Sequence, residues 1–461
     1  MLKYPLTAFR LSPDEKSLFY RNLLKLAVPM ALQSLLMYSL NMIDTLMIGQ
    51  LGEIEIASVA LGNQVFFVLL LFFYGISTGT AVFTAQYWGK KDIPGIRRAM
   101  GLCIVIASCG AILVTLSSVL KPGWILAVFS KDTKVIDLGS DYLRIVCLSY
   151  LLSAVSMSFA MVLRSVERPK LPLLVTFISL VLNTALNYLL IFGKLGFPAL
   201  GVRGAAIATA ISRFVEFALL LTIVYWKETP LAGRIGEFLD ISSAFARQYF
   251  RITIPVVLNE VGWALGFTMY KVVFARMGTE VIAAVNIAEN VTNLFLVAVH
   301  GTSNACAVMI GKLLGAGEDR KAYNYAVRFS IIGPILGVII GFVLILISGW
   351  VSLLFRVPQS VRNTTHIILI LHGLIIPFDI FNWQLIVGIL RSGGDTRFSM
   401  LMEIGTMWGF GVPLAFVAGL VLHQPVVVVF SLVRSEEIVK FAVGIFRLLS
   451  KKWVRNLTEE G

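Results

Sequence analysis

Carboxylates inside long apolar segments are the residues of this sequence whose type and position could do chemistry. Glu260 and Asp379 each lie well inside such a segment, and Asn259 directly precedes Glu260. A charged group in hydrocarbon is costly, so one that is kept usually faces the protein interior and has a function. A buried carboxylate can bind a proton, or it can hold a hard cation such as Na⁺ together with other oxygen ligands. We therefore expect Glu260, Asp379 and Asn259 to bind a coupling cation, and Glu260 and Asp379 to be the metal ligands if that cation is Na⁺.

Further polar and aromatic side chains accompany these acids at helical spacing. Glu289 lies in the next apolar segment and is a fourth candidate for the cation site. Aromatic residues follow Glu260 and flank Asp379 at intervals that place them on common helix faces. Aromatic rings suit flat or cationic organic molecules, which they bind through the ring face. The predicted substrate cavity is lined by Trp263, Phe267, His372 and Trp383.

A second polar patch is predicted in the first half of the chain. One acid, Asp44, shares a helical stripe with amides of the first apolar segment, and further amides form a stripe on the fifth. The alternative for the amides is structural, because polar stripes also hold membrane helices together. The predicted members of this patch are Gln33, Asn41, Asp44, Asn183 and Asn187.

The composition identifies the elements that must position these residues. The chain has 461 residues, of which 57% are hydrophobic and 14% charged, and its mean hydropathy is +0.85. A soluble globular protein is nearer half apolar and a quarter charged. This composition excludes a soluble enzyme, a disordered chain and a small disulfide scaffold, and it requires many membrane-spanning helices. The net charge of +13 does not indicate nucleic acid, because basic residues accumulate in the cytoplasmic loops of membrane proteins.

Twelve segments are long and apolar enough to cross a bilayer, which takes about 20 residues each. Lys and Arg concentrate in the N-terminal segment and in alternate loops, so both termini are expected in the cytoplasm. The predicted protein is therefore an all-α, multi-pass protein of the cell (inner, cytoplasmic) membrane. The twelve segments are 23–48, 59–87, 100–120, 136–163, 171–192, 205–226, 250–274, 282–314, 323–347, 365–390, 398–422 and 426–449.

The chain also repeats itself. Residues 29–89 align without a gap on residues 255–315, and the aligned pairs include prolines and glycines, which mark backbone requirements. Two parallel six-span halves are therefore predicted, and transporters built this way place substrate between the halves. The expected organisation is a cytoplasmic N-terminal segment at 1–22, a six-helix bundle at 23–226, a cytoplasmic linker at 227–248, a second six-helix bundle at 249–450 and a cytoplasmic tail at 451–461.

Three short motifs resemble the multidrug and toxic compound extrusion (MATE) family. Residues 43–49 resemble the Asp-Thr pattern of the family's first span, and residues 187–193 resemble the end of its fifth. Residues 390–396 resemble its Leu-Arg-Gly-x-Gly-Asp-Thr loop. The order and spacing of these motifs in a doubled chain are strongly specific, and the resemblance covers nearly the whole sequence.

This resemblance implies two six-helix bundles around a V-shaped cleft, and export of drugs or organic cations driven by inward Na⁺ or H⁺. The NorM-like branch of the family looks nearest, because it has an acid on its seventh span and another on its tenth. Glu260 and Asp379 match those two positions, and Asp44 matches the family's first-span acid. Asn187 stands where some members have Asp, which argues against a two-acid proton site in the first half.

Three functions are compatible with these sequence features. The first is an antiporter that exchanges Na⁺ or H⁺ for small organic cations or drugs, needs no other cofactor, and acts as a monomer in the lipid bilayer. The second is a flippase for a lipid-linked precursor, for which a more basic interior would be expected. The third is an intramembrane enzyme, which would need a nucleophile–base or metal cluster and would leave the repeat unexplained. We expect the first, and no enzymatic activity.

Overall fold

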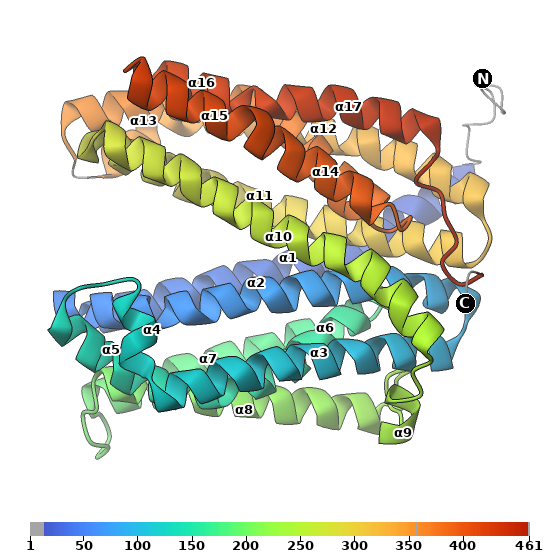
Figure 1. Cartoon of the computed structure of the whole chain (residues 1–461), viewed down its shortest axis with the longest axis horizontal. Coiled ribbons are helices and arrows are strands. Elements are labelled where there is room, and N and C mark those ends of the chain that lie inside the picture. The colour runs from blue at the N-terminus through green and yellow to red at the C-terminus, as the bar shows by residue number, and fades with distance from the viewer. Residues whose placement is uncertain (1–12, 356, 460–461) are drawn as a thin grey trace. The chain divides into compact units, whose positions relative to one another are not determined.

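The structure, a computed structural model, describes residues 13–355 and 357–459, and every regular element in these residues is helical (Figure 1). Eleven helices of this part of the chain are long and apolar enough to cross a membrane. The prediction of an all-α membrane protein is therefore confirmed.

The first half of the chain contains six of these spanning segments. The segment Thr133–Ser165 combines three shorter elements, and α4 is a short helix that precedes it. The bounds are α1 Pro13–Gly49, α2 Glu53–Lys90, α3 Ile93–Leu120, α4 Pro122–Ala127, α5 Thr133–Val146, η2 Cys147–Ser149, α6 Tyr150–Ser165, α7 Lys170–Phe192 and α8 Val202–Trp226.

The rest of the chain begins with the four-residue helix α9 and contains three π-helical stretches, η3, η4 and η5. Its bounds are α9 Ile235–Phe238, α10 Ser243–Met277, α11 Thr279–Gly315, α12 Asp319–Leu354, α13 Gln359–Trp383, η3 Gln384–Leu390, α14 Thr396–Thr406, η4 Met407–Gly411, α15 Val412–Phe416, η5 Val417–Val421, α16 Val426–Arg434 and α17 Glu436–Ser450.

The twelfth predicted span, 426–449, consists of two helices. Helix α16 ends at Arg434 and α17 begins at Glu436, with only Ser435 between them. Neither helix alone has the length of about 20 residues that a span requires. The interruption coincides with the charged residues Glu436, Glu437 and Lys440, which are all buried.

The helix contacts divide the chain into two compact units. Unit 1 comprises Met1–Ala31 and Leu258–Gly461, and unit 2 comprises Leu32–Val257. The boundaries therefore fall inside two continuous helices, α1 and α10. Both helices contain a proline close to the boundary, Pro29 in α1 and Pro255 in α10.

Local sequence signals explain several helix ends. The Asp92 carboxylate accepts a hydrogen bond from the backbone N–H of Gly95 and caps α3, and Asp132 accepts from the N–H of Lys134 and caps α5. Such side-chain caps satisfy backbone N–H groups that the helix itself leaves unpaired. At the end of α7, Gly193 adopts a left-handed conformation with φ 66°, which glycine adopts without steric cost.

Each unit has its own apolar core. In unit 2 the core gathers Phe73, Leu143, Tyr150 and Val202 from four different elements. In unit 1 one core cluster joins the first part of α1, represented by Phe19, to α11, α12, η3 and the segment after α17. These cores hold the helices in register and thereby fix the polar residues described next.

Small residues allow the closest helix contacts in unit 1. Helices α12 and α13 pack side by side, and a Cβ atom on Gly341 would collide with the carbonyl oxygen of Gly373. A Cβ atom on Gly301 of α11 would meet the Ala27 backbone of α1. Membrane helices commonly associate through such small residues, because backbones can then approach closely.

Candidate functional site

The predicted cation ligand Glu260 is held by an arginine from a distant part of the chain. Arg391, directly after η3, donates from Nη1 to Oε1 of Glu260 over 2.7 Å, and its side chain is only 3% exposed. Asn259 is buried beside Glu260, and its Oδ1 has no hydrogen-bond partner among the described residues. Glu260 thus lies in a desolvated setting with one fixed counter-charge and one amide oxygen nearby in sequence that could accept a ligand.

Asp379 on α13 has a different cationic neighbour. Its Oδ2 lies 3.8 Å from Nη1 of Arg434, the last residue of α16, and its Oδ1 is buried without a hydrogen-bond partner in the described part of the chain. His372, predicted for the substrate cavity, lies 3.4 Å from Arg434 through its Nε2. His372 and Asp379 lie seven positions apart on α13, and both lie close to Arg434.

A buried charge network on α17 adjoins Asp379. Nζ of Lys440, whose side chain is 2% exposed, lies 2.8 Å from Glu437, 3.2 Å from Glu403 and 3.3 Å from Glu436. The Tyr270 hydroxyl donates to Glu436 over 2.7 Å. Three carboxylates therefore surround a single ammonium group.

Asn382 extends this network onto α13, the helix that carries Asp379. It lies one helical turn after Asp379 on α13, and its Nδ2 donates to the Glu437 carboxylate and to the Glu437 backbone carbonyl, both over 2.8 Å. Its Oδ1 is buried and has no partner among the described residues. Together with Asp379 and Arg434, this group contains four carboxylates and two cations. We call Asp379, Asn382, Glu403, Arg434, Glu436, Glu437 and Lys440 the α13–α17 network.

The sequence alone favours structural pairs at Glu436, Glu437 and Lys440 and does not connect them with Asp379. Lys440 lies four positions after Glu436 and three after Glu437, and this spacing places the lysine next to both glutamates on the helix surface. Their burial is not evident from the sequence, because α17 in isolation has the polar first turn of a surface helix. Arg391 is conspicuous only as a motif residue, and nothing in the sequence indicates its contact with Glu260.

The remaining predicted residues of unit 1 form small separate groups. Glu289 lies 3.3 Å from Nζ of Lys271, which also sits over the Phe267 ring at 5.1 Å. Trp263 stacks on Phe267 with ring centroids 5.6 Å apart. Trp383 contacts His300 edge to face, and His372 lies against Phe430.

The two predicted coordinating acids are not joined to one another. In the described residues no hydrogen bond or ion pair links Glu260 to Asp379, since each carboxylate contacts its own arginine. The same residues contain no group of three or more His, Cys, Asp and Glu side chains that could hold a metal ion. A Na⁺ ion bound at either acid would therefore take amide or backbone oxygens as its other ligands.

The polar patch predicted in unit 2 divides into two parts. Nδ2 of Asn187 donates to Asp44 over 2.6 Å and to Asn183 over 3.1 Å. Gln33 instead donates to Thr176 over 3.0 Å and accepts from Nε of Arg164 over 3.1 Å. Asn41 is exposed, and its backbone carbonyl accepts from the hydroxyl of Thr45 on the same helix.

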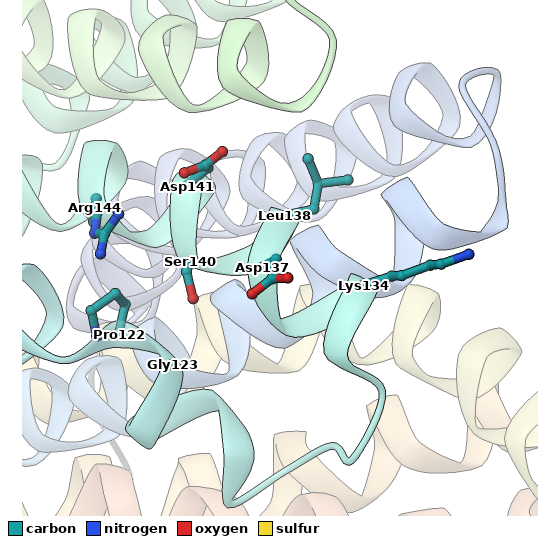
Figure 2. Close-up of a pocket in the computed structure, with 8 residues that line it drawn as sticks. All are labelled: Pro122, Gly123, Lys134, Asp137, Leu138, Ser140, Asp141 and Arg144. Carbon is teal, nitrogen blue, oxygen red and sulfur yellow. The ribbon is translucent and has the colours of Figure 1, made fainter.

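A pocket of about 620 Å³ lies elsewhere in unit 2, between α4 and α5 (Figure 2). None of the predicted site residues lines it. Its charged lining residues are Lys134, Asp137, Asp141 and Arg144, and Asp141 is engaged by Arg203 at 2.7 Å. The pocket is therefore separate from the buried polar groups described above.

Comparison with known proteins places these observations in a family. The MatE family model matches residues 29–189 and 255–417, one match in each half of the chain. "Uncharacterized transporter YisQ" of Bacillus subtilis is 24% identical and covers 94% of this chain and 95% of its own length. "Probable multidrug resistance protein NorM" of Thermotoga maritima is 25% identical, with 90% of this chain and 89% of its own length covered.

Solved structures show the same fold. The crystal structure of a mutant of the Vibrio cholerae MATE transporter VcmN matches with a TM-score of 0.85 at 20% identity, and the match covers 97% of this chain and 99% of that one. The two family matches extend over most of the chain and include Asp44, Asn187, Glu260 and Asp379. The chain therefore belongs to the MatE family, the multidrug and toxic compound extrusion transporters, and is a membrane transporter and not an enzyme.

Proposed function

We propose that this transporter exports small organic cations or drugs in exchange for Na⁺ or H⁺, and that the cation acts on Asp379 and Glu260 in unit 1. The observation that carries the proposal is the excess of carboxylates over cations in the α13–α17 network, where Glu436 and Glu437 are buried and Asp379 and Glu403 are partly buried. Among the described residues, Arg434 and Lys440 are the only cations that form ion pairs with Asp379, Glu403, Glu436 and Glu437. Uncompensated charge is expensive at membrane depth, so such a site favours uptake of a cation.

Orphaned oxygen atoms support the same interpretation. Oδ1 of Asp379 and Oδ1 of Asn382 are both buried without a donor among the described residues, and Oδ1 of Asn259 beside Glu260 is in the same condition. Buried polar atoms are nearly always paired, so each exception calls for an explanation. Oxygen acceptors of this kind are the ligands that hard cations prefer. A proton on Asp379 would neutralise the same carboxylate.

The proposed mechanism is alternating access. A bound organic cation and the coupling ion compete for the same excess of negative charge, so the binding of one promotes the release of the other. The coupling ion drives the cycle only if it binds one conformation more tightly than the other. The stacked rings of Trp263 and Phe267, on the same helix as Glu260, would offer an aromatic face to a flat or cationic substrate.

The membrane setting follows from the loop charges. The concentration of Lys and Arg in the N-terminal segment and alternate loops supports a multi-pass protein of the cell membrane with both termini in the cytoplasm. We also propose that the protein acts as a monomer.

Efflux from proteoliposomes tests the proposal. A fluorescent organic cation is loaded, and a Na⁺ gradient or a pH gradient is imposed alone, in wild type, Glu260→Gln and Asp379→Asn. We expect efflux under one of the gradients and its loss in both variants. Glu216→Gln is the matched control, because Glu216 is a buried acid paired with Arg213 at 2.8 Å in unit 2, and it should retain efflux.

Two results would overturn the proposal in different ways. Gradient-driven efflux that survives both variants but is lost in Asp44→Asn would move coupling to unit 2. Transport of a lipid-linked precursor, with no movement of any soluble organic cation under either gradient, would favour a flippase.

A further inference from the structure

The segment after α17 folds back onto unit 1 instead of extending into solvent. Helix α17 ends at Ser450, and Lys451 takes a left-handed conformation with φ 57°, which turns the chain. Trp453 is fully buried, and Leu457 is 3% exposed. We call residues 451–459 the C-terminal strap.

The strap packs directly against the loop between η3 and α14. A Cβ atom on Gly393 would collide with the backbone carbonyl of Trp453, and one on Gly394 would meet the Leu457 side chain at 2.9 Å. Gly394 also has a φ of 74°, so a side chain there would be strained on both counts. The two glycines thus allow the strap to lie against the loop backbone.

Ion pairs also join this loop to α17 and to the strap. Asp395 accepts two hydrogen bonds from Arg447 of α17, over 2.6 and 2.9 Å, and lies 3.5 Å from Arg455 of the strap. The Asp395 side chain is only 4% exposed. Bidentate arginine–carboxylate pairs are among the stronger and more directional polar contacts in proteins, so the loop is held at both its glycines and its acid.

This loop begins with the arginine that neutralises Glu260. The N–H of Gly394 donates to the Arg391 carbonyl over 2.8 Å, and the N–H of Asp395 donates to the Leu390 carbonyl over 2.9 Å. The Arg391 side chain then reaches Glu260. The contacts therefore run from the strap through Gly393 and Asp395 to Arg391.

We propose that the C-terminal strap positions Arg391 against Glu260 and thereby sets the affinity of the transporter for its coupling cation. Trp453 is the principal positioning residue. It packs directly against Gly393 of the loop, and its ring stacks on Tyr323 of α12 with ring centroids 6.5 Å apart. Arg391 competes with the coupling cation for Glu260. Loosening the strap weakens this competition, so the cation binds more tightly and is released less readily.

This inference rests on the proposed role of Glu260 in coupling, and the test separates the two. The half-saturating concentration of the driving cation, Na⁺ or H⁺, is measured for efflux of a fluorescent organic cation from proteoliposomes. We expect Trp453→Ala, and truncation after Ser450, to lower that concentration by about tenfold, within the range of about 5- to 150-fold typical of coupled sites. The maximal rate should fall with it.

Three further variants show whether the effect passes through the loop. Lys452→Ala is the matched control, because this strap residue is exposed and should behave as wild type. Trp453→Phe keeps an aromatic ring against Tyr323 and should restore most of the wild-type cation dependence. Gly393→Ala should reproduce the shift in the full-length chain and add nothing in the truncated one, where the Trp453 carbonyl is gone.

The effect of Trp453→Ala is then compared between wild type and Glu260→Gln, and this comparison decides whether the strap acts through Glu260. Because Glu260→Gln is expected to lose efflux, cation binding in both backgrounds is followed instead by the shift of the melting temperature in detergent with Na⁺ concentration or pH. In Glu260→Gln, Trp453→Ala should cause no further change in this cation dependence, because the competition has already been removed. A Trp453→Ala shift of equal size in both backgrounds would overturn the inference, as would a wild-type cation dependence in folded, truncated protein. A Glu260→Gln variant with unchanged cation dependence would instead overturn the proposed coupling role, whatever the strap variants do.

Discussion

Arg391 and Glu260, which lie 131 positions apart in the sequence, form a 2.7 Å ion pair in which the arginine side chain is 3% exposed and the glutamate side chain 13%. Removing one member of a buried pair leaves the other charge uncompensated. We expect Glu260→Gln to lower the free energy of unfolding by about 3–5 kcal/mol. Thermal unfolding in detergent measures this change.

The double variant is the control for this prediction. Glu260→Gln combined with Arg391→Gln removes both charges, so it should unfold at a higher temperature than Glu260→Gln alone. Equal melting temperatures for the single and double variants would show that the uncompensated Arg391 charge is not the cause of the loss.

Asp379 and Asn382 should contribute unequally to transport. Asp379→Asn removes the charge that a coupling cation would neutralise, so we expect gradient-driven efflux to fall at least about tenfold, which corresponds to a loss of about 1.4 kcal/mol. Asn382→Ala removes one neutral oxygen and the donor to Glu437, and it should have a smaller effect. Initial rates of efflux in proteoliposomes give both values, and the opposite order would argue against Asp379 as the principal group.

Lys440 should be essential to the stability of unit 1. Its ammonium is the shared counter-charge of Glu403, Glu436 and Glu437, so Lys440→Met leaves three carboxylates without it. We expect a loss of about 3–5 kcal/mol, as for other broken buried pairs. Adding Glu436→Gln should recover part of the loss, and Lys440→Arg should cost less. Melting temperatures in detergent that are the same for all three variants would contradict this.

The linker after α8 should loosen in acid. Glu237 accepts from the Arg234 N–H over 2.6 Å and from Arg97 over 2.8 Å, and the Arg234 N–H, followed by Arg97, holds the pKa of Glu237 below its ordinary value of 4.5. A lowered pKa means that these contacts stabilise the fold above pH 4.5 and are lost as the pH falls through the folded-state pKa.

Hydrogen exchange of residues 228–242 measures this dependence after correction for the intrinsic exchange rate. Protection should stay constant from pH 7 to about pH 5 and decrease at lower pH, with Glu237→Gln showing little change over the whole range. An unchanged pH profile in Glu237→Gln would assign the acid sensitivity to another group.

Much of the helical architecture was predictable, because apolar length and loop charge depend on local composition. Eleven predicted spans correspond to long helices, and the family motifs pointed to the fold that the comparisons found. The break at Ser435 was not predictable, because the segment 426–449 as a whole has the length and the apolar content of one span. The domain boundaries placed at residues 23 and 249 stay a prediction.

Only those members of the candidate site whose residue type is unusual in an apolar segment could be predicted from the sequence. A mid-span acid such as Glu260 or Asp379 is conspicuous in an apolar segment, whereas its partner depends on how distant helices pack. Arg391 lies at the end of a span, where basic residues are common, so its sequence position did not distinguish it. Asn187 and Asp44 could be grouped from the sequence because amides and an acid recur at helical spacing, and the structure joins them.

The division of the chain into units has a consequence for biosynthesis. Unit 2 is one continuous stretch, Leu32–Val257, whereas unit 1 combines Met1–Ala31 with Leu258–Gly461. A ribosome therefore delivers every residue of unit 2 before the first residue of the larger part of unit 1. The part of α1 that belongs to unit 1 is therefore synthesised more than 200 residues before the helices with which it packs.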